Sequence, residues 1–288
     1  MSQVIVSGLI TGSLYALAAL GLVLIFKTSD IVNFAQGEMA MFNTFIAYTL
    51  MTKLGMPYLL AFVLTIIFAA IMGYLVQRIV IRPLFGSPLI SSMIATLGLI
   101  MILNGLAGNL FGFETKNFPK MLNKNNIVIG SISIDPNSLL IILITIGIMF
   151  VLFYYFKYAM KGLAIRAVAQ DPEAAKLMGI SIDKVTMSTW MMSSILSAIA
   201  GMLIAPTTFL DINMMADVHL KSFSSAVLGG FNTFLGPVAG GFILGVVENL
   251  FGRYASLEWK TVFVFALIVI MLVVKPNGIF GKEYRKKV

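Results

Sequence analysis

Residues 4–26 read VIVSGLITGSLYALAALGLVLIF, a run of about 23 residues without a charged side chain. The apolar core of a bilayer is about 30 Å thick, and an α-helix that rises about 1.5 Å per residue crosses it with around 20 residues. This run is therefore long enough to span a membrane. The length of this run is the reference for finding further membrane spans in the rest of the chain.

Further apolar runs of similar length predict membrane helices at about 31–51, 57–76, 88–111, 138–156, 185–206 and 258–274. The region 223–251 is interrupted by Gly229, Gly230, Gly236 and Pro237, which predicts a broken pair, either two short crossings or a re-entrant hairpin. The predicted fold is a single transmembrane domain over residues 1–288. It is an all-α polytopic integral membrane protein with about eight transmembrane helices (about seven to nine) and a broken or re-entrant glycine-rich pair near the C-terminus.

The composition supports this class of protein. The chain is 59% hydrophobic and 11% charged, whereas soluble domains are about 25% charged. The basic residues flank apolar runs, which argues against nucleic-acid binding in spite of a pI near 9.6. The chain has no cysteine and one histidine, His219, which is predicted in a loop outside the membrane. No metal site is predicted, and a nucleophile and base for catalysis are not found.

Basic residues also predict the orientation of the helices. If the amino terminus lies outside, the inner loops and tail hold the larger share of the 20 Lys and Arg residues. These inner residues are Lys27, Arg78, Arg82, Lys157, Lys161, Arg166, Lys176, Lys184, Lys275, Lys282, Arg285, Lys286 and Lys287. The outer ones are Lys53, Lys116, Lys120, Lys124, Lys221, Arg253 and Lys260. This bias places the C-terminus and a polar insert at about 157–184 in the cytoplasm.

The insert contains a short helix with clear end signals. Asp171 is a good N-cap, Pro172 fits the first helical position, Glu173 suits the positive helix end, and Gly179 supplies a stop. The helix would present a small apolar face formed by Ala174, Leu177 and Met178. From spacing alone, this face could dock on a partner or pack on the protein's own cytoplasmic surface.

Polar residues interrupt the second predicted span. Asn33, Gln36, Glu38 and Asn43 lie in a segment that must otherwise suit lipid, and Gly37 permits a close helix contact or a break. We interpret these five residues as candidates for a substrate pathway or gate. Glu38 has a second interpretation, as a structural glutamate close to the cytoplasmic interface.

Small residues at a spacing of four predict close helix packing. The candidates are Gly8 and Gly12 in the first span, Ser193, Ser197 and Gly201 in the sixth, and Gly236 and Gly240 in the broken region.

The chain has no GxxxxGK[ST] loop for ATP. Its Gly281-Lys282 pair is followed by Glu283, and Pro276 stands where the first glycine should be. An ion-coupled carrier would need its own relay of ionisable groups in the membrane, for which Glu38 alone is thin support.

Several segments together resemble one known family. GSLYALAALGLVLIFKTSDIVNFAQGEM at 12–39, SSAVLGGFNTFLGPVAGGFILGVVE at 224–248 and KPNGIFG at 275–281 are similar to LivH-type permease subunits of high-affinity branched-chain amino acid ABC importers. The insert resembles the permease loop with a Glu-Ala-Ala-x-x-x-Gly element. That resemblance implies a coupling helix that contacts the ATPase through Glu173, Ala174, Ala175, Leu177, Met178 and Gly179.

The resemblance also implies partners and a substrate. The partners would be two ATP-binding subunits, a second related permease and an extracytoplasmic solute-binding protein, in the cytoplasmic membrane of a bacterium or archaeon. ATP and Mg²⁺ would be used by the partners, with no cofactor bound by this chain. A small hydrophobic, branched-chain amino acid is the expected cargo, with urea or short amides as the alternative and an ion-coupled secondary carrier as a further one. Gln36 stands where many relatives have histidine.

Overall fold

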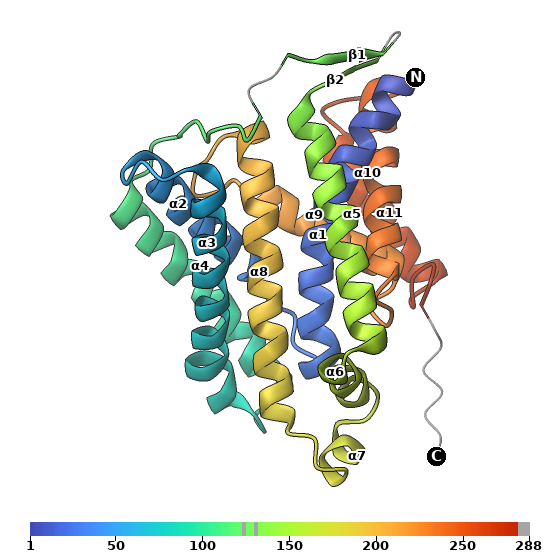
Figure 1. The fold of residues 1–288 in the computed structure, drawn as a ribbon. Coiled ribbons are helices and arrows are strands. Elements are labelled where there is room, and N and C mark those ends of the chain that lie inside the picture. The colour runs from blue at the N-terminus through green and yellow to red at the C-terminus, as the bar shows by residue number, and fades with distance from the viewer. Residues whose placement is uncertain (123–124, 130–131, 282–288) are drawn as a thin grey trace. The chain divides into compact units, whose positions relative to one another are not determined.

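The computed structural model describes residues 1–122, 125–129 and 132–281, and most of this part of the chain is helical (Figure 1). The helices are α1 Ser2–Ser29, α2 Gln36–Thr52, α3 Tyr58–Leu75, α4 Leu89–Phe111, α5 Pro136–Tyr158, α6 Met160–Gln170, α7 Pro172–Leu177, α8 Ile182–Thr208, α9 Ala216–Gly229, α10 Gly236–Tyr254 and α11 Lys260–Val274. α3 continues into a π-helix, η1 (Val76–Ile81), and a 3-10 turn, η2 (Arg82–Leu84). The basic residues Lys124, Lys282, Arg285, Lys286 and Lys287 lie outside the described residues.

Several helices have the length and apolarity that a membrane span requires. Within the described residues there are five of them: α1, α3 with its extension to Leu84, α4, α5 and α8. α11 is apolar but shorter. These helices agree with an all-α, multi-pass membrane protein, while the count of about eight crossings stays a prediction.

The second predicted span begins later than expected. The prediction placed its start near residue 31, but α2 begins at Gln36. The reason is local: α1 ends at Ser29, Asp30 adopts a left-handed conformation with φ 54°, and the Asn33 side chain accepts a hydrogen bond from the Ala35 N–H at 3.1 Å. Such side-chain bonds favour a turn over a helix. Asn33 therefore precedes the helix that Gln36 opens.

The predicted break in the glycine-rich region falls at 230–235, between α9 and α10. Residues of the closing KPNGIFG segment cap the end of α9: the Ile279 N–H donates to Leu228 O at 2.8 Å, and the Phe280 N–H donates to Gly229 O at 3.1 Å. Gly230 has φ 105°, and a Cβ there would lie 2.6 Å from Asn277 O. The choice between two crossings and a re-entrant hairpin stays a prediction.

One local prediction was wrong: His219, predicted in a loop, lies in the first turn of α9. The structure also contains a short hairpin of strands β1 (Ile127–Ile129) and β2 (Ile132–Ile134), antiparallel with Ile127 opposite Ile134, which leaves the all-α class unchanged. Five of its six residues are β-branched, which favours strands. The Gln3 side chain holds the hairpin through two hydrogen bonds to the Ser133 main chain, at 2.9 and 3.0 Å.

Contacts within the chain define two compact units. Unit 1 comprises Met1–Val23, Leu122–Ile148 and Val218–Val288, and unit 2 comprises Leu24–Met121 and Met149–Asp217. In unit 1, the predicted Gly12 brings α1 against Gly241 of α10, while the predicted Gly236 and Gly240 lie against the end of α9. A Cβ on Gly12 would fall 2.8 Å from Gly241 O, and a Cβ on Gly241 would fall 2.6 Å from Ala16 N. The two backbones are thus nearly in contact, as interfaces built on small residues allow.

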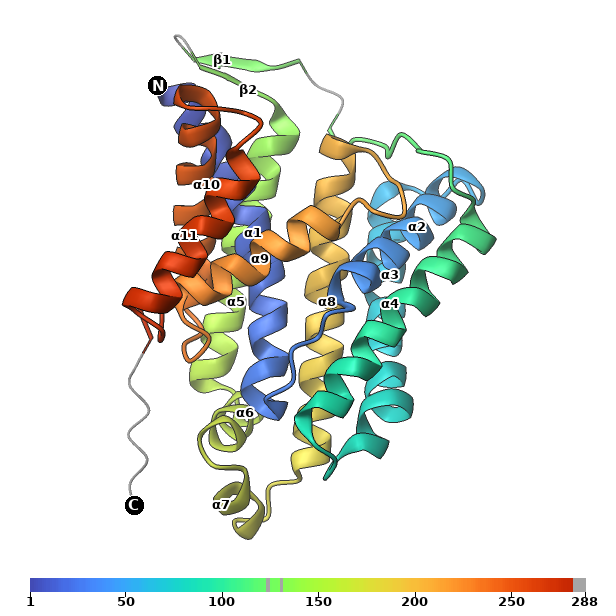
Figure 2. The same cartoon turned by 180° about the vertical axis from the view of Figure 1, so that it is seen from behind.

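In unit 2, α2, α3 and α8 pack against one another, and α4 packs on α2 (Figure 2). Trp190 of α8 is fully buried and shares a core with Met39 of α2, Met72 of α3 and Leu103 of α4. Gly73 lets α3 approach α8 closely, because a Cβ at this position would fall 2.9 Å from Met191 Cα. The core of unit 2 is therefore built around α8.

We expect Gly12→Ala to lower the melting temperature of the purified protein in detergent, because the added methyl group meets fixed backbone and such overpacking costs about 1–3 kcal/mol. Gly98→Ala in α4 is the matched control, since no atom lies within 4 Å of a Cβ there. It should be neutral or stabilising through helix propensity. Equal melting temperatures for the two variants would contradict the close contact of α1 with α10.

Candidate functional site

The polar residues predicted at membrane depth gather at the start of α2. Asn33, Gln36 and Asn43 are almost fully buried, and Gly37 is buried as well. Glu38 is half-buried in the first turn of α2, where the positive end of the helix favours an anion. Glu38 is thus the most accessible of the five residues proposed for a pathway or gate.

Of these residues, Gln36 meets the predicted packing residues of α8 at an interface that we name the α2/α8 seam: Gln36, Ala40 and Thr44 on α2 with Ser193, Ser197 and Gly201 on α8. Asn43 lies near α3, where its Nδ2 is 3.6 Å from Met72 Sδ. The Ser193 hydroxyl donates to Gln36 Oε1 at 3.4 Å. A Cβ on Gly201 would fall 2.9 Å from Ala40 O. Ser197 donates to Ser193 O within its own helix at 2.8 Å. The seam therefore combines close backbone contact with buried polar groups.

Asn43 carries an unusual buried acceptor. Its Nδ2 donates to Met39 O at 2.7 Å, but its Oδ1 has no hydrogen-bond partner among the described residues. The Trp190 indole N–H and the Ser194 hydroxyl are likewise buried without a partner in that part of the chain. An unsatisfied buried polar group costs about 1–3 kcal/mol, so such groups are retained where they have a use.

The short helix of the insert forms as its end signals predict. Asp171 caps α7 by accepting a hydrogen bond from the Ala174 N–H at 2.9 Å, and Pro172 occupies the first helical position. Gly179 has φ 82°, a left-handed conformation that glycine adopts without strain. α6 precedes α7 and contacts it.

α7 exposes part of its predicted apolar face. Leu177 is 90% exposed and Met178 is 70% exposed, while Ala174 is half-buried. Ala175 is only 1% exposed. It therefore anchors α7 to the protein, while the apolar side chains of Leu177 and Met178 remain exposed. Glu173 is exposed in the first turn of the helix.

The structure contains a charged cluster that the sequence analysis missed. Lys221 and Lys260 were predicted in outer loops, and in the sequence Glu248 looks like a polar residue near a span end that water reaches. In the structure Lys221 is buried in α9, and Glu248 in α10 is completely buried. Lys221 Nζ lies 2.7 Å from Glu248 Oε1, and Lys260 Nζ at the start of α11 lies 3.4 Å from it. Lys221 also lies 5.9 Å from the centre of the Tyr15 ring. Opposite charges within neighbouring short apolar helices are the signal that could have indicated this cluster.

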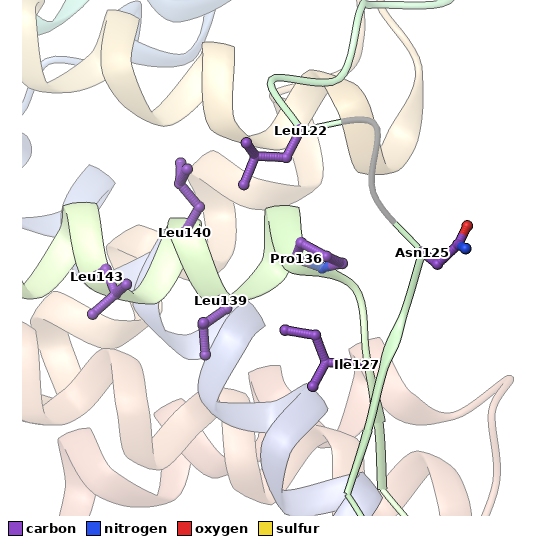
Figure 3. A pocket seen from close by; sticks show the side chains of 7 residues that line it. All are labelled: Leu122, Asn125, Ile127, Pro136, Leu139, Leu140 and Leu143. Carbon is purple, nitrogen blue, oxygen red and sulfur yellow. The ribbon is translucent and has the colours of Figure 1, made fainter.

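An apolar pocket of about 260 Å³ lies between Leu122, Asn125 and Ile127 and the first turns of α5 (Figure 3). Its lining residues are Leu122, Asn125, Ile127, Pro136, Leu139, Leu140 and Leu143. Among the described residues that line it, Asn125 alone has a polar side chain. The α2/α8 seam, which has several buried polar groups, is the better candidate for the pathway of a polar solute.

Long apolar helices with a buried polar seam, together with a capped and exposed short helix between two of them, define a helical membrane transport protein. The sequence matches the family model described as "Branched-chain amino acid transport system / permease component" over residues 4–272. The chain belongs to this family.

Individual relatives agree over nearly the whole chain. The high-affinity branched-chain amino acid transport system permease protein LivH of Salmonella typhimurium is 32% identical, with 99% of this chain and 97% of the relative covered. The corresponding protein BraD of Pseudomonas aeruginosa is 30% identical over the same shares of the two chains. Among solved structures, PsaBC from Streptococcus pneumoniae in complex with Fab has a TM-score of 0.50 at 15% identity, covering 96% of this chain and 92% of that one, which is a likeness of fold alone.

We expect Asn43→Leu to change the stability of the protein little, because the loss of the Nδ2 bonds to Met39 O and Met72 Sδ is offset by removal of a buried acceptor without a partner among the described residues. Uptake of a branched-chain amino acid should fall several-fold if the free acceptor serves the pathway. Thr65→Val is the control, since the buried Thr65 hydroxyl donates to Ala61 O in its own helix. Transport rates and melting temperatures of the two variants check this. Unchanged uptake in Asn43→Leu would remove Asn43 from the pathway.

We expect Glu248→Gln to lower the free energy of unfolding by about 3–5 kcal/mol, because it removes the buried carboxylate that pairs with the Lys221 ammonium. The double change Lys221→Met with Glu248→Met removes both charges and should cost less. Lys260→Gln keeps the closer ion pair and serves as the control. Melting curves in detergent measure all three; a double variant less stable than Glu248→Gln alone would contradict an ion pair as the source of stability.

Proposed function

We propose that the chain is the membrane-spanning permease subunit of an ATP-driven importer that carries a small hydrophobic, branched-chain amino acid across the cytoplasmic membrane. The observation that carries this proposal is the family match over residues 4–272. The exposed pair Leu177 and Met178 on α7 supports it, because an isolated apolar surface on a capped helix suits the groove of a partner.

In this scheme the chain does not hydrolyse ATP itself. Two ATP-binding subunits use ATP and Mg²⁺, a second related permease completes the membrane core, and a solute-binding protein delivers the amino acid from outside. Closure of the ATP-binding subunits pushes on the insert at about 157–184, with Glu173, Leu177 and Met178 at the contact. The helices then change access from one side of the membrane to the other. The solute passes along α2, where Gln36 of the α2/α8 seam offers a polar group together with Glu38 and Asn43 of the same helix.

A permease for urea or short amides is the second candidate, because the polar seam would serve a neutral amide as well as the polar ends of an amino acid. Proteoliposomes that contain the complete importer separate the candidates. ATP-dependent uptake of leucine with little uptake of urea is the expected result. Uptake by this chain alone, driven by an ion gradient without ATP, would overturn the proposal.

The sidedness of α7 is testable because the chain contains no cysteine. In Leu177→Cys, a membrane-impermeant thiol reagent should label the new thiol from the cytoplasmic side only. Leu257→Cys is the matched control, since Leu257 is 78% exposed between α10 and α11 and is predicted on the outer side. Labelling of Leu177→Cys from outside would contradict the coupling role.

The contact itself can be tested with Leu177→Asp, which should weaken binding of the ATP-binding subunits by about 2 kcal/mol, or roughly thirtyfold, if Leu177 is a central docking residue. Leu257→Asp, on the side predicted to be outside, should leave the affinity unchanged. Copurification and titration of the ATP-binding subunits measure the effect.

A further inference from the structure

Asp183 connects the end of the insert to the end of α3. It lies in the first turn of α8, directly after the loop that follows α7. Its Oδ1 accepts a hydrogen bond from Gln77 Nε2 at 3.2 Å, and its Oδ2 lies 3.3 Å from Arg82 Nη2. The carboxylate therefore bridges two residues of the neighbouring helix, and all three belong to unit 2.

The π-helix η1 makes this bridge possible. In an α-helix, residues five apart point about 140° away from each other, because each residue turns about 100°. In η1 the Arg82 N–H donates to Gln77 O, a bond between residues five apart that is typical of a π-helix. The wider turn brings the Gln77 and Arg82 side chains toward one face, where Asp183 contacts both. π-helices are rare and frequently occur at functional sites.

The surroundings make this contact a joint between two firmly packed helices. Gly73, four residues before Gln77, lies against Trp190 and Met191 of α8. Gln77 is completely buried, and its Oε1 has no hydrogen-bond partner among the described residues. The amide of Gln77 therefore donates to Asp183 while its oxygen remains unsatisfied.

We propose that Gln77, Arg82 and Asp183 form a clamp that transmits movement of the insert from the start of α8 to α3, so that these residues position the membrane helices for ATP-driven transport. The proposal rests on the proposed function, because it assumes that the insert receives the movement of an ATP-binding subunit. When α7 is displaced, Asp183 moves with the start of α8. The clamp then draws the end of α3 along and prevents α8 from sliding past it.

The negative charge of Asp183 also stabilises the positive N-terminal end of α8. A variant of Asp183 would therefore change both the clamp and the stability of this helix end. The informative changes are Gln77→Met and Arg82→Gln, which leave Asp183 in place. Methionine keeps the volume of Gln77 and removes an amide with an unpaired oxygen, and the Arg82 ion pair is partly exposed and adds little stability. Neither change should lower the melting temperature or the yield of the assembled complex.

The experiment uses the complete importer in proteoliposomes and measures leucine uptake per ATP hydrolysed. We expect Gln77→Met and Arg82→Gln to lower this ratio by about five- to tenfold, the size of a typical coupling between sites, while ATP hydrolysis continues. Arg78→Gln is the matched control, because Arg78 is an exposed arginine of the same π-helix outside the clamp. Arg78→Gln should show the same leucine uptake per ATP hydrolysed as the unmutated protein.

A conservative change tests the role of the charge. Arg82→Lys keeps a cation beside Asp183 and should recover much of the ratio that Arg82→Gln loses. Unchanged ratios in Gln77→Met and Arg82→Gln, or an equal loss in Arg78→Gln, would overturn the clamp. If the importer with the unmutated chain shows no ATP-driven uptake, the proposed function is overturned. The clamp is then overturned as well, because it rests on that function.

Discussion

A helix that ends in apolar surroundings leaves backbone carbonyl groups without partners, and unit 1 depends on how these groups are satisfied. α9 is too short to cross a bilayer, and the main chain of Ile279 and Phe280 supplies hydrogen bonds to its last carbonyls. Because backbone meets backbone there, side chains are excluded at the contact. Gly278 has φ 78°, and a Cβ on it would fall 2.8 Å from Val227 O. The segments 224–248 and 275–281, which resemble one family in sequence, thus contact each other in the structure.

In unit 2, α8 is the helix on which the packing of the other helices depends. Its first turn carries Asp183, its middle carries Trp190 and Ser193, and Gly201 lies against α2 further along. A rigid helix of this length passes a displacement at one end to residues at the other, since a packed core shifts between discrete arrangements and does not deform continuously. The insert at its start and the polar seam along its side are therefore mechanically connected in the proposed function. The connection runs through a single helix.

The sequence was sufficient where the cause of a structure is local. Asp171 and Gly179 act within α7 itself, so the limits of that helix were predicted correctly, and so were most limits of the long apolar helices. The start of α2 was missed because the Asn33 side chain competes with the helix for a backbone N–H. Lys221 and Glu248 were misplaced for a different reason. Each looks like a residue near the end of a span, and only the packing of α9 on α10 brings the two charges together.

Among the ion pairs of the described residues, Lys221 with Glu248 and Arg82 with Asp183 differ in exposure, and therefore in strength. Glu248 is completely removed from solvent, so separating it from Lys221 would leave charges in apolar surroundings at a cost of several kcal/mol, of order 3–5. A contact with that energy stays formed and fixes its helices. The Arg82 and Asp183 side chains are 42% and 31% exposed, so water can replace either partner and the pair can open at small cost. The exposed ion pair alone would therefore hold α3 to α8 only weakly, and the clamp depends as well on the hydrogen bond that the completely buried Gln77 donates to Asp183.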